Sequence, residues 1–106
     1  RKPDAVFCAS DMMAAGAIRA IQENHLRIPE DVALVGFDDI PLTGFTKIRL
    51  STVRQPIEQF GIKAVDLLID LIEKGNKPAR RMFLDTELVI RESCGAGVLA
   101  GVKIGE

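Results

Sequence analysis

The apolar residues of the first 40 positions form two short runs separated by a segment with helical periodicity. AVFCA (residues 5–9) and VALVGF (residues 32–37) are continuous apolar runs of strand length, typical of strands covered on both faces. Between the runs, apolar residues recur at helical spacing and predict a helix with one buried face: Ala14, Ala17, Ile18 and Ile21. This order predicts a βαβ unit, whose right-handed crossover makes the two strands parallel.

The ends of this first helix carry residues that favour helix caps. Ser10 or Asp11 is expected at the N-cap, because either side chain can accept hydrogen bonds from the first free N–H groups. Asn24 and His25 are expected to end the helix, since both tolerate the left-handed conformation that a helix C-terminus often needs.

The second half of the chain predicts a long helix and one further strand. Residues 39–52 combine Pro, Gly and Thr and predict a loop with a short helical turn. Pro56 suits the first turn of a helix over residues 57–74, which Gly75 ends. Its apolar stripe consists of Ile57, Phe60, Ala64, Leu67, Leu68 and Leu71. The segment MFLDTELVIRES predicts a strand with Leu84, Thr86, Leu88 and Ile90 on one side and Asp85 and Glu87 on the other.

Composition sets limits on partners and location. The 106 residues suffice for one domain, and 14 basic against 15 acidic residues give a formal charge of −1, which does not attract nucleic acid or an anionic membrane. Cys8 and Cys94 lack the spacing of a zinc site or a disulfide framework and are expected to be reduced thiols. No run approaches the roughly 18 apolar residues of a membrane span, and no signal peptide opens the chain. We therefore expect a cytoplasmic protein with no membrane partner.

Motifs of enzymes are missing from the sequence. It contains no G-x-S-x-G, no P-loop and no G-x-G-x-x-G. The sole histidine, His25, stands at a predicted helix end without a nearby Cys or Ser to activate, and a solvent-facing role is expected. The sequence therefore predicts no catalytic residue, no cofactor, no metal ligand and no enzyme activity.

Two adjacent carboxylates, Asp38 and Asp39, follow the second apolar run. Ser10 and Asp38 are expected at the same edge of the sheet, because the carboxyl ends of parallel strands border the crevice where ligands bind. A carboxylate there can accept two hydrogen bonds from adjacent hydroxyls of a sugar-like ligand. Alternatively, the pair could belong to a metal-dependent phosphotransfer domain, or an acid could bind backbone N–H groups of the following loop. We assign the ligand role to Asp38 and the loop role to Asp39.

Four linked motifs resemble the C-terminal part of the effector domain of LacI/GalR-family transcriptional regulators: SDMMAAGAIRA, RIPEDVALVGFDD, LSTVRQP and ELVIRESC. The resemblance runs from Pro3 to Cys94 without an obvious insertion. It implies an α/β fold, a periplasmic-binding-protein-like effector domain with two lobes, of which this chain is a fragment. The family's N-terminal helix-turn-helix is not part of this sequence.

The resemblance implies roles for individual residues. Asp38 resembles the aspartate with which the family binds effector hydroxyls, and Ser10 stands where many members have an asparagine. Serine offers one hydroxyl in place of an amide, so it cannot make the second bidentate contact. Phe37 and Gln55 are close to matching pocket positions and would supply an apolar wall and an amide.

Family geometry also implies how the chain divides. Residues 1–94 would be the C-terminal half of the effector domain, followed by a tail of unknown structure at 95–106. Within that half, residues 3–50 would lie mostly in the C-terminal lobe, 51–56 would form a hinge crossing and 57–75 a helix of the N-terminal lobe. Residues 84–94 would return to the C-terminal lobe, with the crossing near residues 84–86. The expected hinge residues are Thr52, Val53 and Arg54.

The resemblance implies that the first helix and the loop after the acidic pair lie at a homodimer interface, whereas the sequence alone equally allows a solvated helix face and loop. Its candidate residues are Ala15, Arg19, Leu42, Phe45 and Thr46. The apolar stripe of the long helix would lack its partner lobe in this chain, so it is expected to be exposed or to associate.

The sequence thus predicts the effector-binding and dimerisation region of a DNA-binding transcriptional regulator that responds to a small sugar-like or nucleoside-like ligand. DNA would be contacted only through a domain absent from this chain. The alternatives are a solute-binding protein of a sugar transport system and the metal-dependent phosphotransfer domain.

Overall fold

The computed structural model describes residues 1–41, 46–75 and 78–98, and the chain divides into two compact units. The first unit combines Arg1–Arg54 with Glu87–Glu106, and the second is Gln55–Thr86. Each unit is described by itself below.

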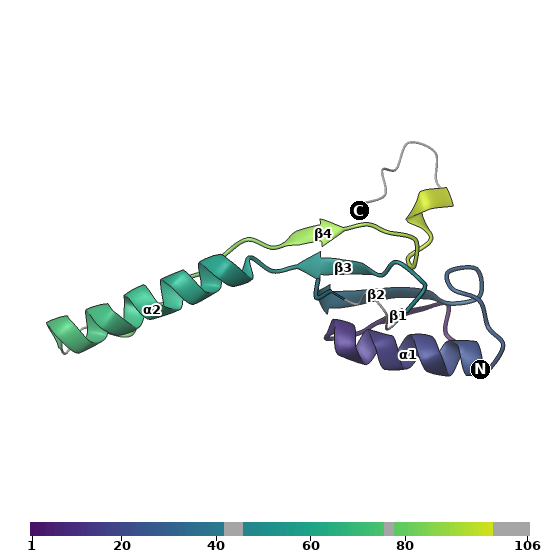
Figure 1. Ribbon diagram of the computed structural model, residues 1–106, viewed down its shortest axis with the longest axis horizontal. Helices are drawn as coiled ribbons and strands as arrows, with labels where there is room; N and C mark the ends of the chain where they lie inside the picture. The colour runs from purple at the N-terminus through teal and green to yellow at the C-terminus, as the bar shows by residue number, and fades with distance from the viewer. Residues whose placement is uncertain (42–45, 76–77, 99–106) are drawn as a thin grey trace. The chain divides into compact units, whose positions relative to one another are not determined.

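The first unit contains a four-stranded sheet in the order β1-β2-β3-β4 (Figure 1). Strands β1 (Ala5–Phe7), β2 (Ala33–Asp38) and β3 (Ser51–Arg54) are parallel, and β4 (Glu87–Val89) runs antiparallel to β3. The predicted α/β fold and the βαβ unit are confirmed, with strand bounds that differ from the apolar runs by one or two residues.

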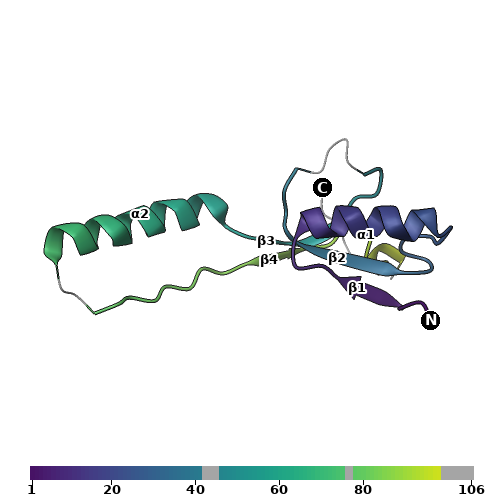
Figure 2. The same ribbon diagram turned by 90° about the horizontal axis from the view of Figure 1, so that it is seen from below.

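Helix α1 (Asp11–Glu23) follows β1 and covers one face of this sheet (Figure 2). Ser10 is its N-cap, and its side-chain oxygen accepts a hydrogen bond from the backbone N of Met13 at 3.2 Å. The predicted apolar face is confirmed, with Ala14 and Ile18 buried and the other two residues half-buried. Core residues between helix and sheet are Cys8, Ala14, Ile18, Leu34 and Leu50.

The helix ends at the expected residues, with Asn24 as its C-cap and His25 directly after it. His25 adopts a left-handed conformation, with φ of 59°. Asn24 has φ of −90°, because it still caps the helix through its backbone N–H and through its side-chain amide, which donates to the carbonyl of Ala20 at 2.8 Å. The turn into the next strand is therefore made at His25.

Strand β2 is not buried on both faces as its apolar composition predicted. Leu34 and Gly36 are buried on the side of α1, whereas Val35 and Phe37 on the opposite side are half-buried. Phe7, which lies opposite Val35 in the register, is 64% exposed. An apolar run shows only that a strand can be buried on both faces. Among the described residues, α1 covers one face of β2.

The segment that returns from the second unit also differs from its prediction. Only Glu87–Val89 form a strand, and Val89 is buried while Leu88 is exposed. Antiparallel pairing with β3 places Val89 opposite Thr52 on the side of α1, so the side that contains Leu88 faces away from the core. After β4, the buried Ser93 hydroxyl donates to the carbonyl of Leu34 at 2.6 Å and accepts from the backbone N of Ser51 at 2.8 Å.

The described parts of the loop between β2 and β3 and of the tail contain little regular structure. The described part of residues 39–52 contains no helical turn, and because residues 42–45 lie outside the described residues, the predicted turn stays a prediction. The beginning of the tail forms a short 3₁₀ helix, η1 (Ala96–Val98), which the sequence did not predict.

The second unit consists of helix α2 (Ile57–Lys74) and an extended segment after it. Its predicted bounds are confirmed, although Pro56 is the N-cap and not a residue of the first turn. Gly75 ends the helix with φ of 59°, a conformation that glycine adopts without strain. Asp70 pairs with Lys74 at 2.9 Å and with Arg80 at 3.1 Å, which joins the helix to the extended segment.

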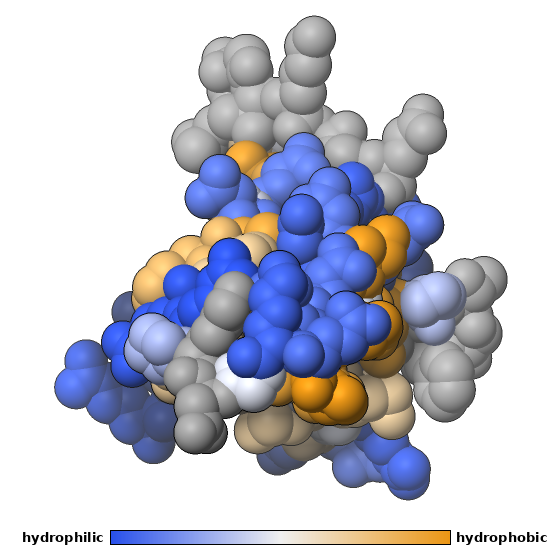
Figure 3. Space-filling view, turned by 90° about the vertical axis from the view of Figure 1, so that its left-hand side faces the viewer, coloured by the Kyte–Doolittle hydropathy of each residue, from blue (hydrophilic) through white to orange (hydrophobic). Residues whose placement is uncertain are grey.

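The apolar stripe of α2 is exposed. No residue of α2 is buried, and Ile57, Leu68 and Leu71 are 60%, 57% and 44% exposed. Figure 3, which looks onto the side where Figure 1 draws α2, shows hydrophobic surface among charged groups. The expected exposure of the stripe is confirmed for the described residues. No helix in the described ranges is long and apolar enough to cross a bilayer.

Candidate functional site

The carboxyl end of β2 carries two consecutive residues with unusual backbone conformations. Asp38, the last residue of β2, has φ of 118°, and Asp39 has φ of 62°. Positive φ is uncommon outside glycine, and a value near 118° is outside the usual left-handed region. Such a conformation persists only where surrounding contacts fix it, and these strained positions cluster at ligand sites. The end of β2 is therefore the first candidate for a functional site.

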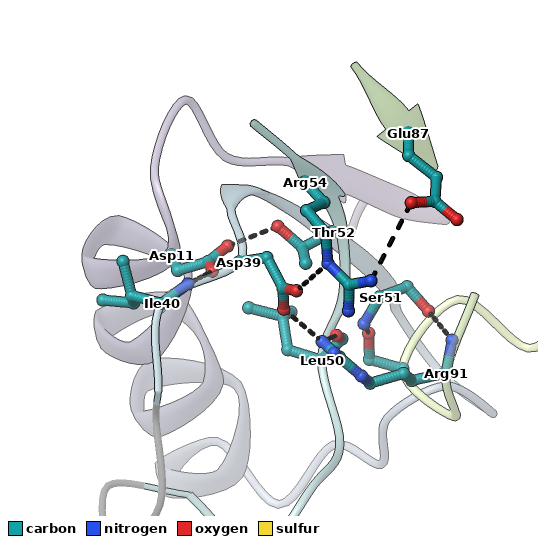
Figure 4. A network of polar contacts seen from close by, with 10 residues as sticks. Asp11, Asp39, Ile40, Leu50, Ser51, Thr52, Arg54, Glu87 and Arg91 are labelled. Carbon is teal, nitrogen blue, oxygen red and sulfur yellow. Dashed lines mark hydrogen bonds and ion pairs between the residues drawn. The ribbon is translucent and has the colours of Figure 1, made fainter. Parts of the chain in front are cut away.

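Asp11 makes one of the contacts that fix this turn (Figure 4). Its side chain is buried at the start of α1, with 1% exposure. One carboxylate oxygen, Oδ2, accepts a hydrogen bond from the backbone N of Ile40 at 2.9 Å, and the other, Oδ1, accepts one from Thr52 Oγ1 at 2.6 Å. One side chain thus connects α1, the turn after β2, and β3.

Gly36 leaves the space that the Asp11 carboxylate occupies. A Cβ built on Gly36 would overlap Asp11 Oδ1 and would come within 2.9 Å of Leu50 Cδ2. The glycine in VALVGFDD is therefore required by close packing and not by its own φ.

Asp39 forms a second set of contacts at the same edge of the sheet (Figure 4). Its carboxylate pairs with Arg54 Nε at 2.6 Å and with Arg91 Nη1 at 2.8 Å. Arg91 also donates to the carbonyl of Leu50 at 2.9 Å, and Arg54 lies 3.8 Å from Glu87 Oε2. The network joins the end of β2 to β3 and to the segment around β4.

The environment of Asp39 favours its charged form. Burial raises the pKa of its carboxyl, but the hydrogen bonds and positive charges of Arg91 and Arg54 outweigh burial and hold the pKa below its ordinary value. The sequence predicted that Asp39 would bind backbone N–H groups of the loop. That prediction is wrong, because two arginines occupy its carboxylate and Asp11 receives the N–H of Ile40.

The predicted ligand residues are distributed over both units. Ser10 follows β1, and Asp38 is the last residue of the adjacent parallel strand β2, so both lie at the same edge of the sheet. Phe37 is half-buried in β2 and pairs with Val53 of β3. Gln55 is half-buried and is the first residue of the second unit. Their role in ligand binding stays a prediction.

The predicted hinge and interface residues have different environments. Thr52, Val53 and Arg54 form the last part of β3, directly before the boundary between the units. On α1, Ala15 is half-buried and Arg19 is exposed and paired with Glu23 at 2.8 Å. Thr46 is half-buried and its hydroxyl bonds to Ile48. Leu42 and Phe45 lie outside the described residues.

Sequence reasoning missed the main partners of the acidic turn. Asp11 was considered only as an alternative N-cap, and Arg91 received no role. The one available signal was the Ser-Asp pair of SDMMAAGAIRA, in which a single residue can cap the helix and the other is left for another function. Within the described ranges, no three His, Cys, Asp or Glu side chains group as a metal site would require.

A family model for the periplasmic-binding-protein-like domain matches residues 1–94. The chain belongs to this domain family. Among curated relatives, the ribose operon repressor of Haemophilus influenzae is 44% identical over 92 residues, which are 87% of this chain and 28% of that protein. The chain thus spans less than a third of the length of this relative.

Solved structures agree with this membership. A LacI-family transcriptional regulator from Enterococcus faecium with bound ribose has a TM-score of 0.76 and 31% identity, covering 88% of this chain and 35% of that one. The lac repressor dimer bound to operator and the anti-inducer ONPF has a TM-score of 0.75 and 34% identity, covering 87% and 28%. Within the domain family, the chain is a LacI/GalR-type member, as its four motifs indicated.

Proposed function

We propose that this chain is the effector-binding and dimerisation region of a LacI/GalR-type transcriptional regulator whose effector is a small sugar or nucleoside. The observation that carries the proposal is the strained Asp38 at the carboxyl end of β2, with φ of 118°. It occupies the sheet edge that open parallel sheets use for ligands. The ribose bound to the Enterococcus faecium regulator supports a polyhydroxylated effector.

Asp38 and Ser10 would act as complementary hydrogen-bonding groups. An ionised carboxylate only accepts, so Asp38 selects a ligand that presents hydroxyl donors, ideally two on neighbouring carbons. The Ser10 oxygen already accepts from the backbone N of Met13, and its hydroxyl proton can donate to a ligand oxygen. Phe37 would provide an apolar wall, and Gln55 would contribute an amide from the second unit.

The division of the chain supports a hinge between two lobes. The first unit ends at Arg54 and resumes at Glu87, so both crossings fall at the ends of β3 and β4. We assign the first unit to the C-terminal lobe and α2 to the N-terminal lobe. The exposed stripe of α2 is the surface that the remainder of the second lobe would cover, and ligand binding between lobes would favour one lobe orientation.

One face of α1 supports the dimer. Met12, which is 58% exposed, lies at helical spacing with Ala15 and Arg19, so the three residues share a face away from the sheet. An exposed methionine beside an alanine is a surface that association would cover. The lac repressor structure is a dimer, which is consistent with a two-fold contact here.

DNA binding would belong to a domain outside this chain, and a protein that regulates transcription in this way would be cytoplasmic and would not be an enzyme. Solute transport is the second candidate, and the regulatory relatives favour the first. A helix-turn-helix encoded upstream of this segment would support regulation, whereas an encoded signal peptide would support transport.

The test uses the complete gene product that carries this chain. A thermal-shift screen of D-ribose, other pentoses, hexoses and nucleosides identifies the effector, because a ligand stabilises the state that it binds. Calorimetry with that compound should then show a loss of affinity of about 1.5–3 kcal/mol for Asp38→Asn, typical of a charged hydrogen bond.

Asp4→Asn is the matched control, because the side chain of Asp4 is fully exposed in the first unit. It should bind as the unmodified protein does. Unchanged binding by Asp38→Asn, or a failure of every sugar and nucleoside to stabilise the protein, would contradict the proposed effector site.

A further inference from the structure

We infer that Asp11 is a positioning residue of the effector site, which holds the backbone of the Asp38–Asp39 turn in its binding conformation. The inference rests on the proposed function, because it assigns Asp11 a role through Asp38. Asp11 itself is buried and would not contact the ligand.

Asp11 binds the backbone at the end of the turn. Its Oδ2 accepts the backbone N–H of Ile40, two residues after Asp38, at 2.9 Å. Asp38 and Asp39, which directly precede this N–H, both have positive φ. A turn with two such residues has a strained backbone that external contacts must hold. The ion pairs of Asp39 hold its side chain, and the bond to Asp11 is the contact that holds the backbone N–H at the end of the turn.

The opposite oxygen of Asp11 fixes the direction of the carboxylate. Thr52 Oγ1 donates to Oδ1 at 2.6 Å, and Thr52 is fully buried. The absent side chain of Gly36 leaves room for Oδ1, and Leu50 closes the same space. The bond from Thr52 and the packing against Gly36 and Leu50 therefore hold the Asp11 carboxylate in the orientation in which Oδ2 accepts the N–H of Ile40.

The position of Asp11 in α1 links this turn to the second candidate residue. Ser10 is the N-cap, and Asp11 is the first residue of the helix. A shift of α1 at its N-terminus would move Ser10 together with the Asp11 carboxylate, which accepts the N–H of Ile40. The relative placement of Ser10 and Asp38 is thus determined by one buried side chain, in addition to the pairing of β1 with β2.

The main variant is Asp11→Ala in the complete gene product, tested with the effector identified by the thermal-shift screen. It removes both bonds, and we expect effector affinity to fall at least tenfold. Hydrogen–deuterium exchange of the Ile40 amide should become at least tenfold faster without effector. Asp11→Asn should restore affinity to within threefold, because its Oδ1 can accept from Ile40 while its Nδ2 donates to Thr52.

Ser93→Ala is the matched control for a loss of buried hydrogen bonds. Ser93 is fully buried and its hydroxyl makes two hydrogen bonds, to Leu34 and Ser51, but it does not contact the turn. We expect Ser93→Ala to lower the melting temperature while effector affinity stays within twofold. If it lowers affinity as much as Asp11→Ala does, Asp11 acts through general stability and the inference is wrong.

A double-mutant cycle separates positioning from stability. If Asp11 acts through Asp38, Asp11→Ala should cost less than threefold in affinity once Asp38 is already Asn. Losses that multiply in the double variant, or unchanged affinity in Asp11→Ala, would overturn the inference. Should Asp11→Ala fail to fold, Asp11→Ser serves the same measurements, since its one short hydroxyl cannot reach both partners.

The two proposals fail in different ways. If Asp38→Asn binds normally, the effector site itself is misplaced, whatever Asp11 does. If Asp38→Asn weakens binding but Asp11→Ala does not, only the positioning role is wrong. If no effector is found, an Ile40 amide whose exchange is unchanged in Asp11→Ala still overturns the claim that Asp11 holds the turn.

Discussion

Asp39 Oδ1 and Arg91 Nη1 form an ion pair at 2.8 Å between residues 52 positions apart in the chain. Both side chains are largely buried, with 12% and 15% exposure. The pair links the turn after β2 to the segment that follows β4. It therefore connects the candidate effector site to the strands at the unit boundary.

Removal of Arg91 is expected to destabilise the protein more than removal of Arg54. Arg91→Met leaves the Asp39 carboxylate with one partly exposed partner, and we expect a loss of about 2–4 kcal/mol in unfolding free energy. Arg54→Met is the control, because Arg54 is 47% exposed, and we expect a loss below about 1 kcal/mol. Urea denaturation followed by circular dichroism measures the unfolding free energy of both variants. Equal losses would show that the buried Arg91 pair contributes no more to stability than the exposed Arg54 pair.

Acid should remove the stabilisation that Asp39 provides. The pKa of Asp39 is lowered from 3.8 in the folded protein, so its contribution is fully present above the unfolded pKa and is lost as the pH falls through the folded pKa. The difference in unfolding free energy between the unmodified protein and Asp39→Asn should be constant from pH 7 to pH 5 and shrink below about pH 4. Denaturant titrations at each pH measure it, and a difference that grows on acidification would contradict the lowered pKa.

Gly36 should not tolerate a methyl group. Gly36→Ala would force its Cβ against Asp11 Oδ1 and Leu50 Cδ2, and we expect a loss of about 2 kcal/mol or more. Gly61→Ala in α2 is the matched control, because apart from its chain neighbours and the backbone of its own helix no atom lies within 4 Å of its Cβ position. It should stabilise by about 0.5–1 kcal/mol through helix propensity. Thermal unfolding distinguishes them, and a neutral Gly36→Ala would show that Asp11 can move.

A charge on the proposed interface of α1 should weaken the dimer. Met12→Glu places a carboxylate beside Ala15. In a two-fold dimer, the same carboxylate of the second subunit would repel it, so we expect the dimer dissociation constant to rise at least tenfold. Met13→Glu is the control, since Met13 is similarly exposed, at 60% against 58%, but points about a quarter-turn away. Analytical ultracentrifugation measures both, and equal effects would place the interface elsewhere.

The sequence by itself determined the features that depend on neighbouring residues. Helix α2 has the predicted bounds, because its apolar periodicity and Gly75 are local signals. The βαβ unit followed equally from chain order, since a right-handed crossover leaves one arrangement. The expectation that Ser10 and Asp38 share a sheet edge has the same basis, and the parallel pairing of β1 with β2 fulfils it.

Only the tertiary structure decided which partner each polar group has. Asp39 pairs with Arg91 and not with its own loop, because strand pairing brings a distant guanidinium closer than the local N–H groups. Asp11 binds the turn after β2, because α1 packs beside Gly36, which leaves room for a buried carboxylate. Val89 is buried and Leu88 is exposed for the same reason: the register of β4 on β3 sets which side of the strand meets the core, and local alternation does not specify that register.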